Sequence, residues 1–279
     1  MDIKLPYFDM ILDAIARNDR PTIDAFGTHV HWGYWPDPNQ ADGSIPDFAI
    51  AAQRLSECVY EAAQIQDGDR VLDAGCGFGG TTACLNERYH DLRITGLNID
   101  QRQLDRAATL VTPTHNNTIN WVCANACELP FKDNSFDRIL AVECIFHFPS
   151  REQFLREVKR VLKPGGTLAL SDFTLLPITV PLFKFLSLFA NGSVERLYGD
   201  VGSTDFTIPA YERLAKTIGL AIETNRDITR NTLPTYPILK QICRQFNLDE
   251  AESVAASQEL VSTLGLVRYV VLSFRTLSV

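Results

Sequence analysis

Hydrophobic and polar positions follow two repeats along this chain. Short apolar runs, typical of buried strands, alternate with stretches in which apolar residues recur every three or four positions, as on one helix face. The runs predict strands over 70–74, 93–99, 119–124, 136–144, 167–171, 221–227 and 266–276. The other stretches predict helices over 47–65, 81–88, 101–110 and 209–218, and one that opens at Ser150. This alternation indicates an α/β fold.

The helix at Ser150 has clear signals at both ends. Gln153 follows Ser150 by three positions, a spacing that lets the two residues cap the first turn reciprocally. The run Pro164-Gly165-Gly166 ends the helix, because proline cannot continue it and glycine favours its termination. The predicted apolar face is Phe154, Leu155, Val158, Val161 and Leu162.

The remaining segments surround this core. Residues 1–45 predict an irregular entry with one short helix, and 232–262 predict a helical excursion. A chain of 279 residues is long for one domain and short for two independent ones. We therefore interpret 1–279 as a single domain. Its parts are an N-terminal covering segment (1–45), a cofactor-binding core (46–172) and lid insertions that cover a substrate (173–207 and 228–262).

Composition narrows the function classes. The formal net charge of −8 disfavours nucleic acid as a partner, because phosphate backbones need a basic footprint. Seven cysteines, an odd number without a recognisable signal peptide, indicate reduced thiols and a cytoplasmic location. The cysteines have no second Cys/His pair at zinc spacing, so we expect no metal site. The apolar stretch 175–190 is too short and too interrupted to span a membrane.

A glycine-rich turn after the first predicted strand is the strongest chemical signal. Gly75, Gly77 and Gly80 would let backbone N–H groups approach a ligand at a helix N-terminus. Their spacing also satisfies the dinucleotide fingerprint, and Asp100 lies at about the right distance downstream. Asp73 argues against that reading, because a dinucleotide-binding strand is normally apolar there. Asp-x-Gly-x-Gly-x-Gly is instead typical of S-adenosylmethionine-dependent methyltransferases.

Further motifs in the same order strengthen this resemblance. They are Gly96–Asp100, Leu129–Phe131, Ser135–Asp137 and Val161–Gly166. Together with the glycine turn they resemble class I small-molecule methyltransferases of the ubiquinone/tocopherol methyltransferase type. The runs 143–149 and 166–173 look most like natural-product sugar O-methyltransferases, such as those acting on rebeccamycin-type glycosides, and 31–35 resembles their entry segment.

The resemblance implies a Rossmann-like class I methyltransferase fold. That fold has a seven-stranded, mostly parallel sheet with an antiparallel last strand, helices on both faces and a helical lid. The alternating run 266–272 suits such a last strand. A dinucleotide-binding domain would close with a parallel strand instead.

The resemblance also implies which residues bind S-adenosylmethionine. The methionine end would lie on the glycine backbone, with Asp73 orienting the turn. Asn98 and Gln103 would hold the ribose, although most relatives have Asp or Glu at the position of Asn98. Tyr34 and Trp35 offer π-faces to the sulfonium. The predicted cofactor-binding residues are Tyr34, Trp35, Asp73, Gly75, Gly77, Gly79, Asn98, Ile99, Gln103, Asn125, Ala126 and Glu143.

Two candidate catalytic residues follow predicted strands. His147 comes after the fourth strand and Asp172 after the fifth, so both face the carboxyl edge of the sheet, where α/β folds bind ligands. An aliphatic hydroxyl needs a base as it attacks, and histidine titrates near neutrality. We expect His147 to be that base and Asp172 to orient it or hold the acceptor. The sugar enzymes have two adjacent histidines, whereas Phe146 replaces the first here.

The acceptor is expected to be a hydrophobic small molecule, such as a glycoside or polyketide. The insertion carries an apolar set suited to a lid, namely Phe173, Leu175, Leu176, Phe183, Phe185, Leu188 and Phe189. These residues could instead pack on the core or join two subunits as a homodimer. C- or N-methylation of a prenyl quinol or amine remains open, as does a non-catalytic protein that binds S-adenosylmethionine or S-adenosylhomocysteine.

Overall fold

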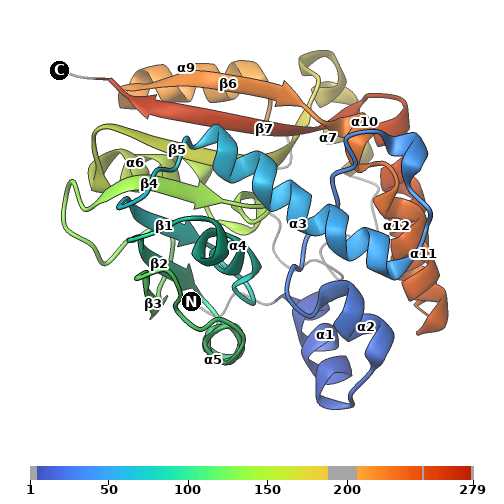
Figure 1. Cartoon of the computed structure of the whole chain (residues 1–279). Coiled ribbons are helices and arrows are strands. Elements are labelled where there is room, and N and C mark those ends of the chain that lie inside the picture. The colour runs from blue at the N-terminus through green and yellow to red at the C-terminus, as the bar shows by residue number, and fades with distance from the viewer. Residues whose placement is uncertain (1–4, 188–205, 247, 278–279) are drawn as a thin grey trace.

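The computed structural model describes residues 5–187, 206–246 and 248–277, within which one sheet organises the chain. Its order is β3-β2-β1-β4-β5-β7-β6. β1 to β5 are parallel, while β7 runs antiparallel to both β5 and β6 (Figure 1). The strands are β1 (Arg70–Ala74), β2 (Arg93–Asn98), β3 (Thr118–Cys123), β4 (Phe136–Ala141), β5 (Leu162–Leu175), β6 (Leu220–Asp227) and β7 (Val267–Thr276). The predicted fold, with its antiparallel last strand, is confirmed.

Two expectations about strand length are wrong. β5 starts before the predicted 167 and runs past 171, because it continues to pair with β7 as far as Leu175. β4 ends at Ala141 rather than 144, since the chain then turns through a short 3₁₀ helix, η2 (Ile145–His147). This turn places the residues after β4 at the edge of the sheet instead of within it.

Helices cover both faces of the sheet. α3 (Ile45–Ala62) packs on α4 (Gly80–Arg88) and crosses β5 and β7 on one face, while α6 (Arg151–Val161) and α9 (Ile208–Ile218) pack together (Figure 1). α5 (Gln101–Leu110) contacts β2 and β3. As predicted, Ser150 is the N-cap of α6, with its hydroxyl accepting from Gln153 N–H at 3.1 Å.

Successive strand residues face opposite sides of the sheet and fill two separate cores. Val71 packs with Leu55 and Val59 of α3, whereas the next residue, Leu72, packs with Phe154 and Leu155 of α6. All six side chains are completely buried. This is the two-sided burial expected of a central parallel strand, and it explains why the adjacent residues Val71 and Leu72 are both apolar.

Further helices gather at the end of the sheet to which the arrow of β4 points (Figure 1). The N-terminal segment contains α1 (Pro6–Ala16), α2 (Arg20–Phe26) and η1 (Pro38–Gln40), more than the one short helix expected. After β6 come α10 (Thr229–Thr232), α11 (Thr235–Gln245) and α12 (Asp249–Thr263). The first insertion holds η3 (Pro177–Thr179) and α7 (Val180–Ser187), while Leu188 and Phe189 lie outside the described residues. No helix in the described ranges is long and apolar enough to cross a bilayer.

Gly96 lets β2 and β3 approach closely. It pairs with Trp121, and a Cβ on Gly96 would lie 2.3 Å from the Trp121 ring. We expect Gly96→Ala to lower the free energy of unfolding by about 1–3 kcal/mol, the usual effect of overpacking, as measured by urea denaturation. Thr95→Ala, at the adjacent half-buried position, should cost less. Adding Trp121→Leu should restore part of the loss, and a Gly96→Ala protein as stable as the parent would contradict this packing.

Candidate active site

The glycine-rich turn is fixed by backbone and side-chain hydrogen bonds. The N–H groups of Gly75 and Cys76 both donate to the carbonyl of Leu97, at 2.7 and 3.0 Å. Asp73 is buried, and Thr82 Oγ1 donates to its Oδ2 at 2.8 Å. Burial raises the pKa of Asp73 to about 6, against the opposing effect of the Thr82 hydrogen bonds. The carboxylate thus ties the end of β1 to the first turn of α4.

Glycine is required at two points of this turn. Gly75 and Gly77 have φ of +77° and +54°, which L side chains rarely adopt. A Cβ on Gly75 would also lie 2.7 Å from the Cβ and Sγ atoms of Cys144, so the loop after β4 sits directly on the glycine. Close packing here forms the floor of a cavity.

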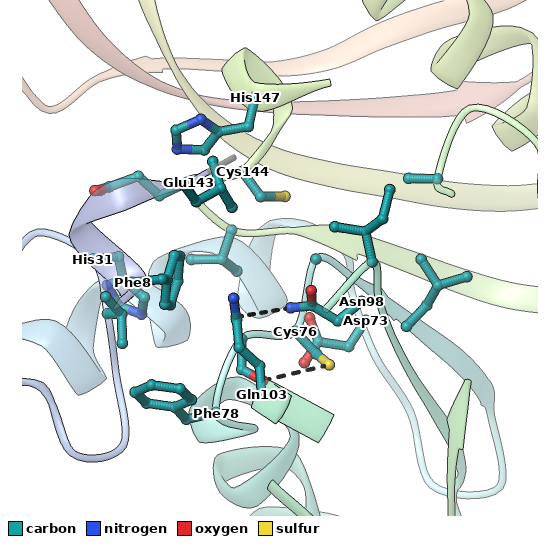
Figure 2. A pocket seen from close by; sticks show the side chains of 18 of the residues that line it. Phe8, His31, Asp73, Cys76, Phe78, Asn98, Gln103, Glu143, Cys144 and His147 are labelled. Atoms are coloured by element: carbon teal, nitrogen blue, oxygen red, sulfur yellow. Dashed lines mark hydrogen bonds between the residues drawn. The ribbon is translucent and has the colours of Figure 1, made fainter. Parts of the chain in front are cut away.

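This first cavity lies along the carboxyl ends of β1, β2 and β4. Figure 2 shows Glu143 and His147 toward one end and Asp73, Asn98 and Gln103 toward the other. Of the site residues predicted from the sequence, those that line this cavity are Asp73, Gly75, Gly77, Asn98, Ile99, Gln103, Asn125, Ala126, Glu143 and His147. Gly79 is not a lining residue, and with φ of +82° it serves as the N-cap of α4. The structure therefore brings most of the predicted cofactor-binding residues together.

Asn98 and Gln103 form a hydrogen-bonded pair in the cavity wall. Asn98 Nδ2 donates to Gln103 Oε1 at 3.1 Å, and Asn98 Oδ1 accepts from Asp100 N–H at 3.0 Å. Gln103 Nε2 is buried and has no hydrogen-bond partner among the described residues. A buried amide donor left unpaired is costly, and a ligand hydroxyl would satisfy it.

Asn125 and Ala126 lie on the turn after β3. Asn125 Oδ1 accepts from Cys127 N–H at 2.9 Å, so this oxygen shapes the turn. Its amide group and the buried Ala126 still border the cavity.

The structure places Tyr34 and Trp35 away from both cavities. Tyr34 packs in the core with its hydroxyl bonded to Arg226, and Trp35 Nε1 donates to Asp47 at 2.7 Å. This corrects the expectation that their rings face the sulfonium. From the same segment, His31 lines the first cavity instead.

His31 and its neighbour His29 are site residues that the sequence prediction missed. His29 Nδ1 lies 3.1 Å from His31 Nε2, which is 3.1 Å from Ser56 Oγ. Burial lowers the pKa of His29 to about 3 and that of His31 to about 4, so both rings are neutral at pH 7. The spacing of these two histidines in the sequence did not indicate that they line the cavity, because their placement depends on how an irregular segment folds.

Glu143 lies where the first cavity meets a second one. Its Oε2 accepts from the N–H of Trp32 at 3.0 Å and from the hydroxyl of Tyr269. Burial raises the pKa of Glu143 to about 8, despite these two hydrogen bonds. Its backbone φ of +48° belongs to the left-handed region that non-glycine residues seldom occupy.

His147 lies at the same junction and lines both cavities. Its Nε2 is 3.1 Å from the hydroxyl of Tyr7, and the two rings stack with centroids 5.7 Å apart. Burial, together with the positive charge of Arg151, lowers the pKa of His147 to about 4. The imidazole is therefore neutral at pH 7 and able to accept a proton.

Asp172 lines neither cavity, which corrects the prediction that it holds the acceptor or orients His147 directly. Its completely buried carboxylate accepts from Arg151 at 2.9 and 3.1 Å and from Tyr211 OH at 2.6 Å. Asp172 thus fixes Arg151, and its influence on His147 runs through that guanidinium.

The second cavity is large, about 1040 Å³, and mostly apolar. Its walls come from α1, the end of β5, α11 and α12, including Met10, Ile11, Phe146, Phe173, Leu239, Val254 and Val261. Tyr7, Val30, His31, Glu143 and His147 line both cavities. The two spaces therefore meet at a neutral imidazole and a carboxyl group.

Comparison with known proteins agrees with this geometry. A methyltransferase domain model matches residues 72–170. The chain is 35% identical to Methyltransferase GfsG of Streptomyces halstedii over 218 residues, 76% of this chain and 73% of that protein. It is also 31% identical to the 27-O-demethylrifamycin SV methyltransferase of Amycolatopsis mediterranei over 244 residues, 87% of this chain and 85% of that one.

The chain belongs to the class I S-adenosylmethionine-dependent methyltransferases. Its cofactor is S-adenosylmethionine, and the cradle fits it through the close backbone at Gly75 and the unpaired donor of Gln103. The crystal structure of the mycolic acid cyclopropane synthase CmaA1, complexed with S-adenosylhomocysteine, has the same fold. Its TM-score is 0.77 at 16% identity, covering 98% of this chain and 99% of that one.

Gln103 gives a direct test of the cofactor cradle. Because Gln103 Nε2 has no hydrogen-bond partner in the described part of the chain, we expect Gln103→Ala to weaken S-adenosylmethionine binding roughly threefold to tenfold, the effect of losing one hydrogen bond. Isothermal titration calorimetry measures this change. Gln101→Ala, on the exposed face of the same helical turn, is the control and should bind as the parent does. Equal affinity for Gln103→Ala would place the ribose elsewhere.

Proposed function

We propose that the protein transfers a methyl group from S-adenosylmethionine to a hydroxyl group of a lipophilic small molecule, with His147 as general base. The observation that carries this proposal is the junction of the two cavities. Five residues border both spaces, and the only imidazoles among them are His31 and His147. His31 is bonded to the Trp32 carbonyl and to Ser56, which leaves His147 as the base.

The second cavity suits a bulky and hydrophobic acceptor. Its volume of about 1040 Å³ is at the upper end for small-molecule sites, and its walls are mainly aliphatic and aromatic. The N-terminal segment covers the cofactor side, since Tyr7, Phe8 and His31 all border the first cavity. Residues 228–262 and the end of β5 cover the acceptor side. The relative from Amycolatopsis, named for O-methylation of a rifamycin, supports this class of acceptor.

The residues perform this transfer mainly by alignment. The cofactor supplies a methyl group on a positively charged sulfur. In the displacement the acceptor oxygen–carbon bond would form, the carbon–sulfur bond would break, and His147 would gain a proton at Nε2 as the acceptor hydroxyl loses one. Holding the three reacting atoms in line supplies much of the rate, and the buried junction excludes water. Burial, with a smaller effect of Arg151, keeps the imidazole neutral at pH 7, so its Nε2 can accept that proton.

The function is tested by transfer of a labelled methyl group from S-adenosylmethionine to a panel of probes. Glycosides, polyketide alcohols, phenols, amines and prenyl quinols are incubated separately and read by mass. We expect label in an alcohol or glycoside. Label only in amines or prenyl rings would retain the cofactor chemistry and overturn the hydroxyl acceptor. Cofactor binding with no label in any class would contradict the proposal and favour a non-catalytic binding protein.

Replacing the base gives a second prediction. We expect His147→Gln to lower kcat on a hydroxyl acceptor roughly 10²–10⁴-fold while the cofactor affinity stays nearly unchanged. Steady-state kinetics and calorimetry measure the two quantities. His90→Gln, at an exposed histidine that lines neither cavity, is the control. A loss below tenfold would point to alignment without a base.

The pH profile of the same enzyme provides an independent readout. A base is active when unprotonated, so activity should fall only as pH drops through the lowered pKa of about 4, not near the usual histidine value of 6.5. The charged and titratable groups around His147 are Tyr7 from α1, Arg151 from α6, and Glu143 and Cys144 preceding η2. Glu143, with a pKa of about 8, would add a limb at higher pH. An acid limb at 6.5 in the parent that vanishes in His147→Gln would contradict the buried, neutral imidazole.

A further inference from the structure

We infer that Tyr7 is a second catalytic residue, whose hydroxyl passes the acceptor proton to Nε2 of His147. This inference rests on the proposed function, because it assumes that His147 is the base. It goes beyond that function by assigning a role to α1, a helix whose sequence showed no chemical motif.

The accessibility of the two ring nitrogens leads to this conclusion. His147 Nδ1 is buried and has no hydrogen-bond partner among the described residues. Nε2 is the ring atom that faces another polar group, the Tyr7 hydroxyl at 3.1 Å. Since Nδ1 is closed off, a proton from the acceptor can enter the ring only at Nε2, and Tyr7 already occupies that position.

The position of Tyr7 suits a relay. Tyr7 lines both cavities, and its hydroxyl lies beside His147, which also lines both. Its ring stacks on the imidazole with an interplanar angle of 21°, which limits how far either ring can turn. A phenolic hydroxyl can accept one hydrogen bond while donating another, as a relay requires.

α1 is anchored on the cofactor side of the site. Asp9 pairs with Arg102 of α5 at 2.8 Å, one position before the cofactor-facing Gln103. Phe8 packs edge-on against Phe78 of the glycine-rich turn, with ring centroids 5.8 Å apart. The helix that carries Tyr7 is therefore held by the same turn and helix that hold the cofactor.

The relay balances as two coupled proton transfers. As the acceptor oxygen bonds to the methyl carbon and the carbon–sulfur bond breaks, the acceptor O–H bond breaks and its proton moves to the Tyr7 oxygen. The original Tyr7 proton moves at the same time to His147 Nε2. Tyr7 ends neutral, the imidazole ends protonated, and the ring later releases its proton to solvent.

The test is Tyr7→Phe in the full chain, with the alcohol or glycoside methylated in the panel as the probe. Phenylalanine keeps the ring and removes only the hydroxyl, so we expect kcat to fall roughly 10–10²-fold with the KM for S-adenosylmethionine unchanged. Tyr89→Phe is the matched control, since this half-buried tyrosine packs on Tyr60 outside both cavities, and it should match the parent.

A double variant separates this inference from the proposed function. If Tyr7 acts through His147, Tyr7→Phe should cost nothing further once His147→Gln is present. Full activity of His147→Gln alone would overturn the proposed base and the relay together. If His147→Gln loses activity as expected but Tyr7→Phe is as active as the parent, the relay alone is overturned. The relay alone is also overturned if Tyr7→Phe has a lower KM for the acceptor and a higher kcat/KM. The latter result would mean that Tyr7 competes with the acceptor. A further loss in the double variant would also overturn it.

Discussion

The carbonyl of Leu97 supports the whole site. By accepting from both Gly75 and Cys76 it binds the end of β2 to the turn that follows β1. The turn can then lie close to Cys144 after β4, where a single added methyl group on Gly75 would collide. The carboxyl ends of β1, β2 and β4 are thereby held close together. Every residue of the cofactor cavity is positioned relative to that contact.

Desolvation decides the chemistry at the junction. Burial keeps His147 neutral, and it favours the protonated form of Glu143, whose pKa rises to about 8. A neutral imidazole and a mostly uncharged carboxyl group can lie close together without a large electrostatic cost. The charge that is present, on Arg151, is balanced by the fully buried Asp172 beneath it. Although it is paired with Asp172, Arg151 still contributes to the lowered pKa of His147.

The two cavities are built from different parts of the chain. The parallel strands and their helices provide a rigid cofactor cradle, whose residues follow β1, β2 and β3 in the chain. The second cavity is built from segments outside that alternation, chiefly α1, α11 and α12. A cofactor common to the family needs constant geometry, whereas elements outside the sheet can vary without disturbing it.

The sequence by itself determined the alternation of strands and helices, because that depends on local periodicity. The resemblance of its motifs to class I methyltransferases implied the antiparallel last strand and the residues of the cofactor cradle. Only the tertiary structure decided the rest. Tyr34 and Trp35 turned into the core and His31 into the cavity, because an irregular segment has no repeat that fixes which face is buried. Asp172 proved to be the partner of Arg151, and Tyr7 reached His147 across 140 positions of sequence, because both contacts depend on packing between distant elements.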